Sequence, residues 1–188
     1  MPVWLNLPNL LTGVRLLLTP FVVVAILEHR YERALALFFA AGFSDGLDGF
    51  LARRYGWITR LGTYLDPVAD KALLVSVYLA LGAAGALPQW LVALVVGRDI
   101  LILLLAGAGY VLLKEREFPP ALWGKVSTVI QIATAFLATA HFAYPGLGLE
   151  GALEASTALA GLGTIWSGLY YLWRAGRVFQ ASGRRVSR

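Results

Sequence analysis

The chain has 188 residues, of which 59% are hydrophobic and 14% charged, and its mean hydropathy is +0.69. A soluble domain carries about 25% charged residues, so this composition is typical of a membrane protein. The absence of cysteine excludes a disulfide framework and a thiolate metal site, and two histidines are too few for a histidine-based zinc site. The net charge of +5 comes from basic residues that flank apolar runs, which favours a membrane surface over nucleic acid as the partner.

Six stretches of the chain are long and apolar enough to cross a bilayer, which takes about 20 helical residues each. The expected spans are Leu10–Leu27, Arg33–Arg53, Gly62–Leu81, Pro88–Leu113, Leu122–Phe142 and Ala152–Trp173. A short interfacial segment, Val3–Asn9, is expected before the first span, and a basic tail, 174–188, after the last. The connections are short, which predicts one all-α integral membrane domain over residues 1–188.

The basic residues sort by side of the membrane. One side receives Arg15, Arg53, Arg54, Arg60, Lys114, Arg116, Lys125 and the five arginines from Arg174 onward. The other side receives only Arg30 and Arg33, which Glu28 and Glu32 offset. Because positive charge accumulates on the cytoplasmic side, we expect a multi-pass cell-membrane protein with both termini in the cytoplasm.

Four aspartates interrupt two of the apolar runs. Asp45 and Asp48 lie in the second run, and Asp66 and Asp70 lie in the third. Each charge placed in hydrocarbon costs about 2.5–3.5 kcal/mol on insertion scales, so the group demands compensation. Residues three or four apart share a helix face, and the short loop 54–61 makes the two helices antiparallel neighbours. The acidic faces can then meet near the cytoplasmic side, where divalent metal would compensate carboxylates well.

Two other interpretations of the aspartates compete with a metal site. They could form structural ion pairs with Arg53, Lys71 and Arg98, or they could line the path of a small cation transporter. A transport path predicts acidic groups throughout the membrane depth. Here the other candidates, Glu150 and Glu154, lie at the opposite end of the spans. The clustering near one face therefore favours a metal site.

The residues around the aspartates carry a family resemblance. The run Asp45-Gly-Leu-Asp48-Gly49-Phe-Leu-Ala52-Arg53, then eight residues, then Gly62-Thr-Tyr-Leu-Asp66-Pro-Val-Ala-Asp70, resembles the signature of the CDP-alcohol phosphatidyltransferases at all eight fixed positions. The resemblance continues through Asn6–Arg15, Gly97–Asp99 and Gly124–Gln131, and covers about residues 5–175. Intramembrane prenyltransferases also use aspartates with Mg²⁺, but they lack the Gly-x-x-Ala-Arg continuation that follows Asp48.

This resemblance implies a six-helix membrane fold, a homodimer, and the displacement of CMP from CDP-diacylglycerol by an alcohol. It implies that Asp45, Asp48, Asp66 and Asp70 bind one or two Mg²⁺ or Mn²⁺ ions, and that Asp70 also accepts the proton of the acceptor hydroxyl. It further implies contacts to the CDP group from Asp48, Gly49, Ala52, Arg53, Thr59 and Gly62.

Two branches of the family differ in the acceptor. Phosphatidylglycerophosphate synthases, which use glycerol-3-phosphate, typically show Arg-Glu, an arginine eight positions after that first Arg, and Gly-Lys-x-Lys-Thr. Here the corresponding residues are Arg98-Asp99, Ala106 and Ser127, so two cations for a free phosphate are missing. The chain resembles the CMP-forming cardiolipin synthases better, which favours phosphatidylglycerol as acceptor. The candidate acceptor or phosphate contacts are Arg15, Arg98, Lys125 and Ser127. The three basic residues could instead lie at helix ends with their charges at the membrane surface, or pair with an aspartate. Ser127, Thr128 and Gln131 could equally form hydrogen bonds across helices.

Overall fold

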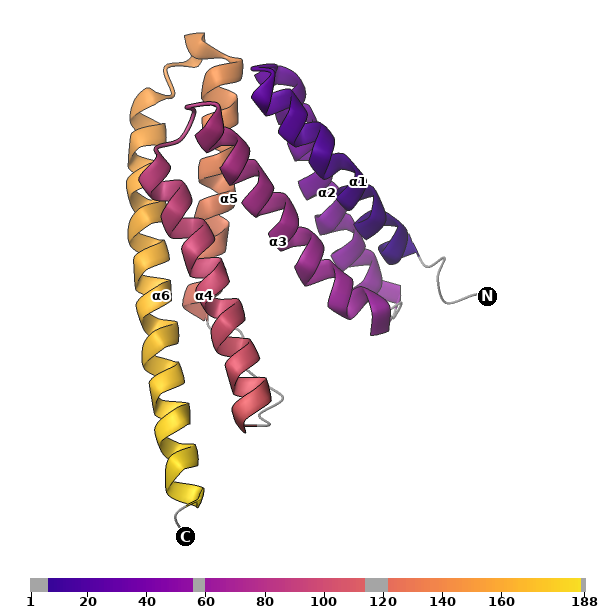
Figure 1. Ribbon diagram of the computed structural model, residues 1–188. Helices are drawn as coiled ribbons and strands as arrows, with labels where there is room; N and C mark the ends of the chain where they lie inside the picture. The colour runs from indigo at the N-terminus through magenta and orange to yellow at the C-terminus, as the bar shows by residue number, and fades with distance from the viewer. Residues whose placement is uncertain (1–6, 56–59, 114–121, 187–188) are drawn as a thin grey trace. The chain divides into compact units, whose positions relative to one another are not determined.

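The computed structural model describes the backbone of residues 7–55, 60–113 and 122–186, and the side chains of 13–44, 69–105, 107 and 122–177. Over these residues the chain is helical and contains no strand (Figure 1). The helices are α1 (Leu7–Leu27), α2 (Tyr31–Tyr55), α3 (Arg60–Ala83), α4 (Gln89–Leu113), α5 (Leu122–Ala143), the short 3-10 helix η2 (Pro145–Leu147) and α6 (Glu150–Val186). The six long helices coincide with the six apolar runs, while most of the expected interfacial segment Val3–Asn9 lies outside the described residues.

The last helix is longer than the sequence predicted. The expected span ended at Trp173 and left a basic tail, whereas α6 has 37 residues and continues to Val186. At 1.5 Å per residue it is about 55 Å long, well beyond the roughly 30 Å hydrocarbon core of a bilayer. The arginines from Arg174 to Arg185 therefore lie on a continuation of helix α6 beyond the expected span.

The chain forms two compact units. The first comprises Met1–Pro88 and Ala135–Glu150, and the second comprises Gln89–Thr134 and Gly151–Arg188. Helix α5 contributes its first part to the second unit and its last turns to the first. The single domain expected over residues 1–188 stays a prediction.

In the first unit α1 packs against both α2 and α3, and the three helices run side by side in Figure 1. Small residues on α2, Ala34 and Ala41, are fully buried and allow this close approach. The core also contains Val22, Ile26, Val77, Tyr78 and Leu81. The Phe38 and Phe136 rings, with centroids 6.5 Å apart, connect α2 to the end of α5.

Two helices of this unit end in left-handed residues. Gly85 follows α3 with φ +75°, and the Ala86 amide donates to the Leu81 carbonyl at 2.8 Å. His29 takes the same role after α1 with φ +56°, and the Arg30 amide donates to the Ala25 carbonyl at 2.8 Å. These bonds satisfy carbonyl groups that a helix end otherwise leaves without partners, and they reverse the chain within a few residues.

In the second unit α4 packs closely against α6. A Cβ atom on Gly161 of α6 would lie 2.8 Å from the Trp90 ring of α4, so only glycine permits this contact. Polar side chains fill much of the interior between α4, α5 and α6: Arg98, Asp99, Ser127, Gln131, Thr134, Thr164 and Ser167 are all buried. Hydrogen bonds between side chains therefore connect the helices of this unit, in addition to apolar contacts.

The outer faces of the helices carry large apolar side chains. Exposed examples are Leu17, Phe21, Phe39, Phe43, Leu103, Leu104, Val129, Leu162 and Leu169. Among the helices of the described residues, Leu122–Ala143 alone is long and apolar enough to cross a membrane by length and composition, and Gly13–Leu27 is a shorter apolar helix. The six-span arrangement and the side of each terminus stay predictions.

Candidate metal and nucleotide site

The four aspartates fall on two consecutive helices of the first unit. Asp45 and Asp48 lie in the second half of α2, and Asp66 and Asp70 lie in the first half of α3. Of these four aspartates, Asp70 is the only one whose side chain the structure describes. The side chains of the other three lie outside the described residues, so the convergence of all four stays a prediction.

Asp70 is held by an arginine from a different helix. The Nη1 group of Arg15, on α1, donates a hydrogen bond to Oδ1 of Asp70 within an ion pair. The Arg15 side chain is 1% exposed, whereas the Asp70 side chain is 48% exposed. The carboxylate is thus anchored on one side by a buried cation and accessible on the other. A carboxylate in this state can accept a proton or bind a metal through its accessible side.

Arg15 lies on α1, within the first unit. Thr19, one turn after Arg15 on α1, donates from Oγ1 to the Arg15 carbonyl at 2.8 Å. A charged guanidinium inside an apolar helix requires a counter-charge, and Asp70 supplies one. The sequence predicted Arg15 as a phosphate contact, with pairing to an aspartate as the alternative, and the structure shows the pairing, with Asp70 as the partner. The sequence feature that indicates this pair is the single arginine within the apolar run Gly13-Val-Arg15-Leu-Leu-Leu-Thr19.

No group of three or more His, Cys, Asp and Glu side chains gathers within the part of the chain whose side chains are described. That part includes a single member of the aspartate set. The set supplies carboxylate oxygens alone, which are the donors that Mg²⁺ and Mn²⁺ prefer, so its chemistry fits the implied ions.

For most of the residues implied in CDP binding, the structure describes only the backbone. Gly49, Ala52 and Arg53 follow the first two aspartates on α2, and Gly62 precedes Asp66 on α3. Their side chains, and Thr59 as a whole, lie outside the described residues. Their contacts stay predictions.

Arg98, a candidate acceptor contact, is enclosed by protein groups of the second unit. Its Nε donates to Ser167 Oγ at 3.2 Å, and its Nη1 donates to Asp99 Oδ1 at 2.8 Å. Its Nη2 donates to Ser167 Oγ at 2.8 Å and to the Gly124 carbonyl at 3.3 Å. All three guanidinium nitrogens thus have protein acceptors. The sequence did not predict the contribution of Ser167.

The other two candidates from the second unit lie on the first turns of α5. Ser127 is buried, and its Oγ accepts a hydrogen bond from Gln131 Nε2 at 3.4 Å. The same Nε2 donates to Thr164 Oγ1 of α6 at 2.9 Å, as expected for a polar contact across helices. Lys125, in contrast, is exposed. Of the cationic candidates Arg15, Arg98 and Lys125, the lysine is the one whose side chain is open to solvent.

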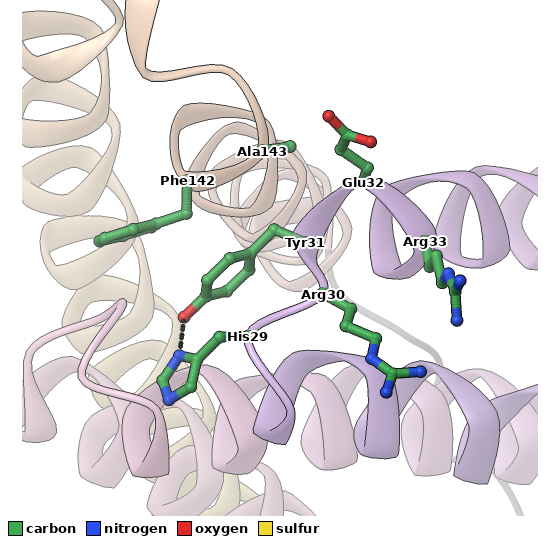
Figure 2. A pocket seen from close by; sticks show the side chains of 7 residues that line it. All are labelled: His29, Arg30, Tyr31, Glu32, Arg33, Phe142 and Ala143. Atoms are coloured by element: carbon green, nitrogen blue, oxygen red, sulfur yellow. Dashed lines mark hydrogen bonds between the residues drawn. The ribbon is translucent and has the colours of Figure 1, made fainter.

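A separate hollow of about 450 Å³ lies in the first unit and is lined by His29, Arg30, Tyr31, Glu32, Arg33, Phe142 and Ala143. Figure 2 shows the Tyr31 hydroxyl directed at His29, and the two polar atoms are 3.1 Å apart. Arg33 lies twelve residues before Asp45 on α2, which corresponds to about 18 Å of helix. The hollow is therefore not part of the aspartate site.

Comparison with known proteins defines the class. The sequence model of the CDP-alcohol phosphatidyltransferases matches residues 5–168. The chain therefore belongs to the CDP-alcohol phosphatidyltransferase family. The family consists of membrane-associated enzymes that generally use divalent metals, so the chain is an enzyme and the cation-transporter interpretation is excluded.

The individual relatives are named as two kinds of enzyme, phosphatidylglycerophosphate synthases and CMP-forming cardiolipin synthases. The chain is 35% identical to a probable phosphatidylglycerophosphate synthase of Mycobacterium tuberculosis, over 90% of this chain and 81% of the relative. It is 31% identical to a CMP-forming cardiolipin synthase of Streptomyces coelicolor, over 94% of this chain and 86% of the relative. It is 32% identical to a probable CMP-forming cardiolipin synthase of Drosophila melanogaster, over 83% of this chain and 56% of the relative. These similarities support phosphatidyl transfer and do not decide the acceptor.

Proposed function

We propose that this chain transfers the phosphatidyl group of CDP-diacylglycerol to a hydroxyl of phosphatidylglycerol, releasing CMP and forming cardiolipin. The observation that carries the proposal is the exposure and the ion pair of Asp70, the last aspartate of the family signature. Its carboxylate is half-exposed and anchored by the buried Arg15, as a proton acceptor and metal ligand requires. The cardiolipin synthases among the relatives support the same reaction.

The metal would be held by Asp45, Asp48, Asp66 and Asp70. One or two Mg²⁺ or Mn²⁺ ions bound there would neutralise the pyrophosphate of the CDP group and the charge that builds up on the phosphate of the leaving CMP. Asp48, Gly49, Ala52, Arg53, Thr59 and Gly62 would bind the CDP group. Glycine and alanine leave room for the nucleotide against α2 and α3, while the Arg53 guanidinium pairs with phosphate oxygens.

The transfer exchanges one phosphorus–oxygen bond for another. The acceptor hydroxyl oxygen forms a bond to the phosphorus that carries diacylglycerol, and the bond from that phosphorus to the CMP oxygen breaks. CMP leaves with the electron pair of the broken bond. Asp70 accepts the proton of the hydroxyl, and the hydrogen bond from Arg15 fixes the orientation of its carboxylate.

The choice of acceptor rests on the cations that the chain lacks. A free glycerol-3-phosphate carries a phosphate with about two negative charges, which several cations would have to bind. Ala106 and Ser127 stand where the glycerophosphate branch has basic residues, and four of the five N–H groups of the buried Arg98 guanidinium already donate to Asp99, Ser167 and the Gly124 carbonyl. The remaining exposed cation, Lys125, suits the single charge of a phosphodiester such as that of phosphatidylglycerol.

Glycerol-3-phosphate is the second candidate acceptor. The Mycobacterium tuberculosis relative named as a phosphatidylglycerophosphate synthase aligns with 90% of this chain, which favours this alternative. The two candidates share every proposed catalytic residue and differ only in the acceptor that enters.

We further propose a multi-pass protein of the cell membrane with six spans, both termini in the cytoplasm, and a homodimeric assembly. The apolar outer faces of the helices and their buried polar interiors support a lipid environment. Basic residues gather on one side of the expected membrane. They lie near the start of the first apolar run, at the end of the second, after the fourth and after the sixth, and this excess supports the orientation.

The experiment offers both acceptors to the purified protein at equal concentration, with CDP-diacylglycerol and Mg²⁺, and identifies the lipid product by mass. We expect cardiolipin as the main product. Phosphatidylglycerophosphate as the main product would transfer the assignment to the second candidate and leave the catalytic residues unchanged.

A further inference from the structure

The guanidinium of Arg98 connects all three helices of the second unit. Arg98 and its acceptor Asp99 belong to α4, the Gly124 carbonyl belongs to α5, and Ser167 belongs to α6. The Arg98 side chain is only 5% exposed, so each of these bonds forms away from water. Charge-assisted hydrogen bonds in such surroundings are stronger than neutral ones, and breaking one leaves a buried donor without compensation.

The first turn of α5 is shaped to receive this group. A Cβ atom on Gly124 would lie 2.8 Å from the Tyr171 hydroxyl oxygen and 3.2 Å from Nη2 of Arg98. Tyr171 of α6 is buried, and the Arg98 guanidinium carbon lies 5.8 Å from the centre of its ring. Glycine at position 124 is therefore what lets Arg98 and Tyr171 reach the α5 backbone together.

We propose that Arg98, Ser167 and Tyr171 form a clamp on Gly124 that positions the first turns of α5, and with them Lys125 and Ser127, for the acceptor. In this arrangement Arg98 is a positioning residue and does not itself bind the acceptor phosphate. The proposal rests on the proposed function, because it assigns the clamp to the acceptor side of that reaction.

Geometry favours positioning over direct binding. Four of the five N–H groups of the Arg98 guanidinium already donate to Asp99, Ser167 and the Gly124 carbonyl, so a phosphate could bind at most one of them without displacing these groups. Lys125 follows Gly124 directly and is exposed, so a displacement of Gly124 moves the lysine backbone with it. Two residues further on, Ser127 receives the hydrogen bond from Gln131, which also reaches Thr164 of α6. The start of α5 is thus tied to α6 over two successive turns.

The first test compares two buried hydroxyl groups. Ser167→Ala removes the acceptor of two Arg98 bonds, whereas Thr134→Val removes a bond of Thr134 Oγ1 to the Ser156 carbonyl, 3.1 Å long, elsewhere between α5 and α6. We expect Ser167→Ala to raise the KM for the acceptor by about tenfold and to leave the KM for CDP-diacylglycerol within about twofold. Thr134→Val should change neither. Equal effects of both variants on the acceptor KM would contradict the clamp.

The second test uses compensation between two residues. Gly124→Ala places its Cβ against the Tyr171 hydroxyl, and Tyr171→Phe removes that oxygen. We expect Gly124→Ala to raise the acceptor KM by about tenfold, and the double variant Gly124→Ala/Tyr171→Phe to recover most of the loss. A double variant that is worse than both single variants would refute the proposed contact.

A third measurement works without any activity. Because the chain contains no cysteine, Val126→Cys on the exposed face of α5 gives a single attachment point for a spin label. We expect the label to become more mobile when Ser167→Ala or Gly124→Ala is added, and to stay unchanged with Thr134→Val. A label that responds to none of them would refute the clamp even in an active enzyme. A wild-type protein that releases no CMP would refute the proposed function while the label still tests the clamp.

Discussion

The pair between Arg15 and Asp70 makes the most direct prediction about the catalytic carboxylate. Replacing Arg15 by Met removes the cation but keeps a side chain of similar length in the same buried place. Removing one partner of an ion pair is costly where it leaves the other charge buried, but Asp70, at 48% exposure, keeps contact with water. We therefore expect a loss of stability of no more than about 1 kcal/mol, or a fall in Tm of about 2–4 °C for a protein of this size.

The effect of Arg15→Met on catalysis should be much larger than its effect on stability. Without its anchor the Asp70 carboxylate samples several rotamers, and a misplacement of about 1 Å costs up to about 100-fold in rate. We expect kcat to fall by about 10- to 100-fold in assays with saturating Mg²⁺. Arg15→Lys, which keeps the charge but loses the planar donor geometry, should fall between the wild type and Arg15→Met.

Thr19→Val is the matched control for Arg15→Met, because Thr19 is buried one turn further along α1 and bonds only to the Arg15 carbonyl among the described residues. It should keep kcat within about twofold. CMP release and thermal unfolding followed by tryptophan fluorescence measure the two quantities on the same samples. Full activity in Arg15→Met would refute the role of the anchor, and a fall in Tm of more than about 10 °C would refute the stability reasoning.

Four further predictions follow from the site and the fold. Asp70→Asn should reduce CMP release by at least about 100-fold while the protein still folds, as its Tm would report; full activity would remove Asp70 from the mechanism. Chelation with EDTA should abolish turnover and added Mg²⁺ or Mn²⁺ should restore it, whereas turnover that persists in EDTA would contradict a metal requirement. Ala106→Arg should raise the kcat/KM for glycerol-3-phosphate relative to phosphatidylglycerol, and an unchanged ratio of the two products would count against the acceptor argument. Gly161→Ala, whose Cβ would lie 2.8 Å from the Trp90 ring, should lower stability by about 1–3 kcal/mol, and an unchanged Tm would contradict the close packing of α4 on α6.

The sequence alone predicted the helices because each is a long apolar run between short connections that contain charged residues, glycine or proline. It located the helix ends within a few residues where a turn signal follows, as at Gly85 after α3. It failed at the end of α6, where arginines replace apolar residues but the helix continues to Val186. Arginine is a good helix former, so a change from apolar to basic marks the expected membrane boundary and not the helix end.

The sequence predicts which helix face a candidate site residue occupies where the signal is local, and the site that these residues would form stays a prediction. The aspartates and their glycines are spaced along single helices, so the sequence places them on faces without knowledge of the fold. The partners of Arg15 and Arg98 are 55 and 69 residues away along the chain, at Asp70 and Ser167. Periodicity specifies which face a residue occupies but not which distant helix covers it, and these two contacts therefore required the structure.

Release of CMP from CDP-diacylglycerol by the purified protein tests the central claim most directly. The account predicts that CMP appears only when both a divalent metal and an alcohol acceptor are present, and in a one-to-one ratio with the new phosphatidyl product. Phosphatidylglycerol should give the highest rate and yield cardiolipin. A protein that releases no CMP with any acceptor, or releases it in equal amount without one, would contradict phosphatidyl transfer.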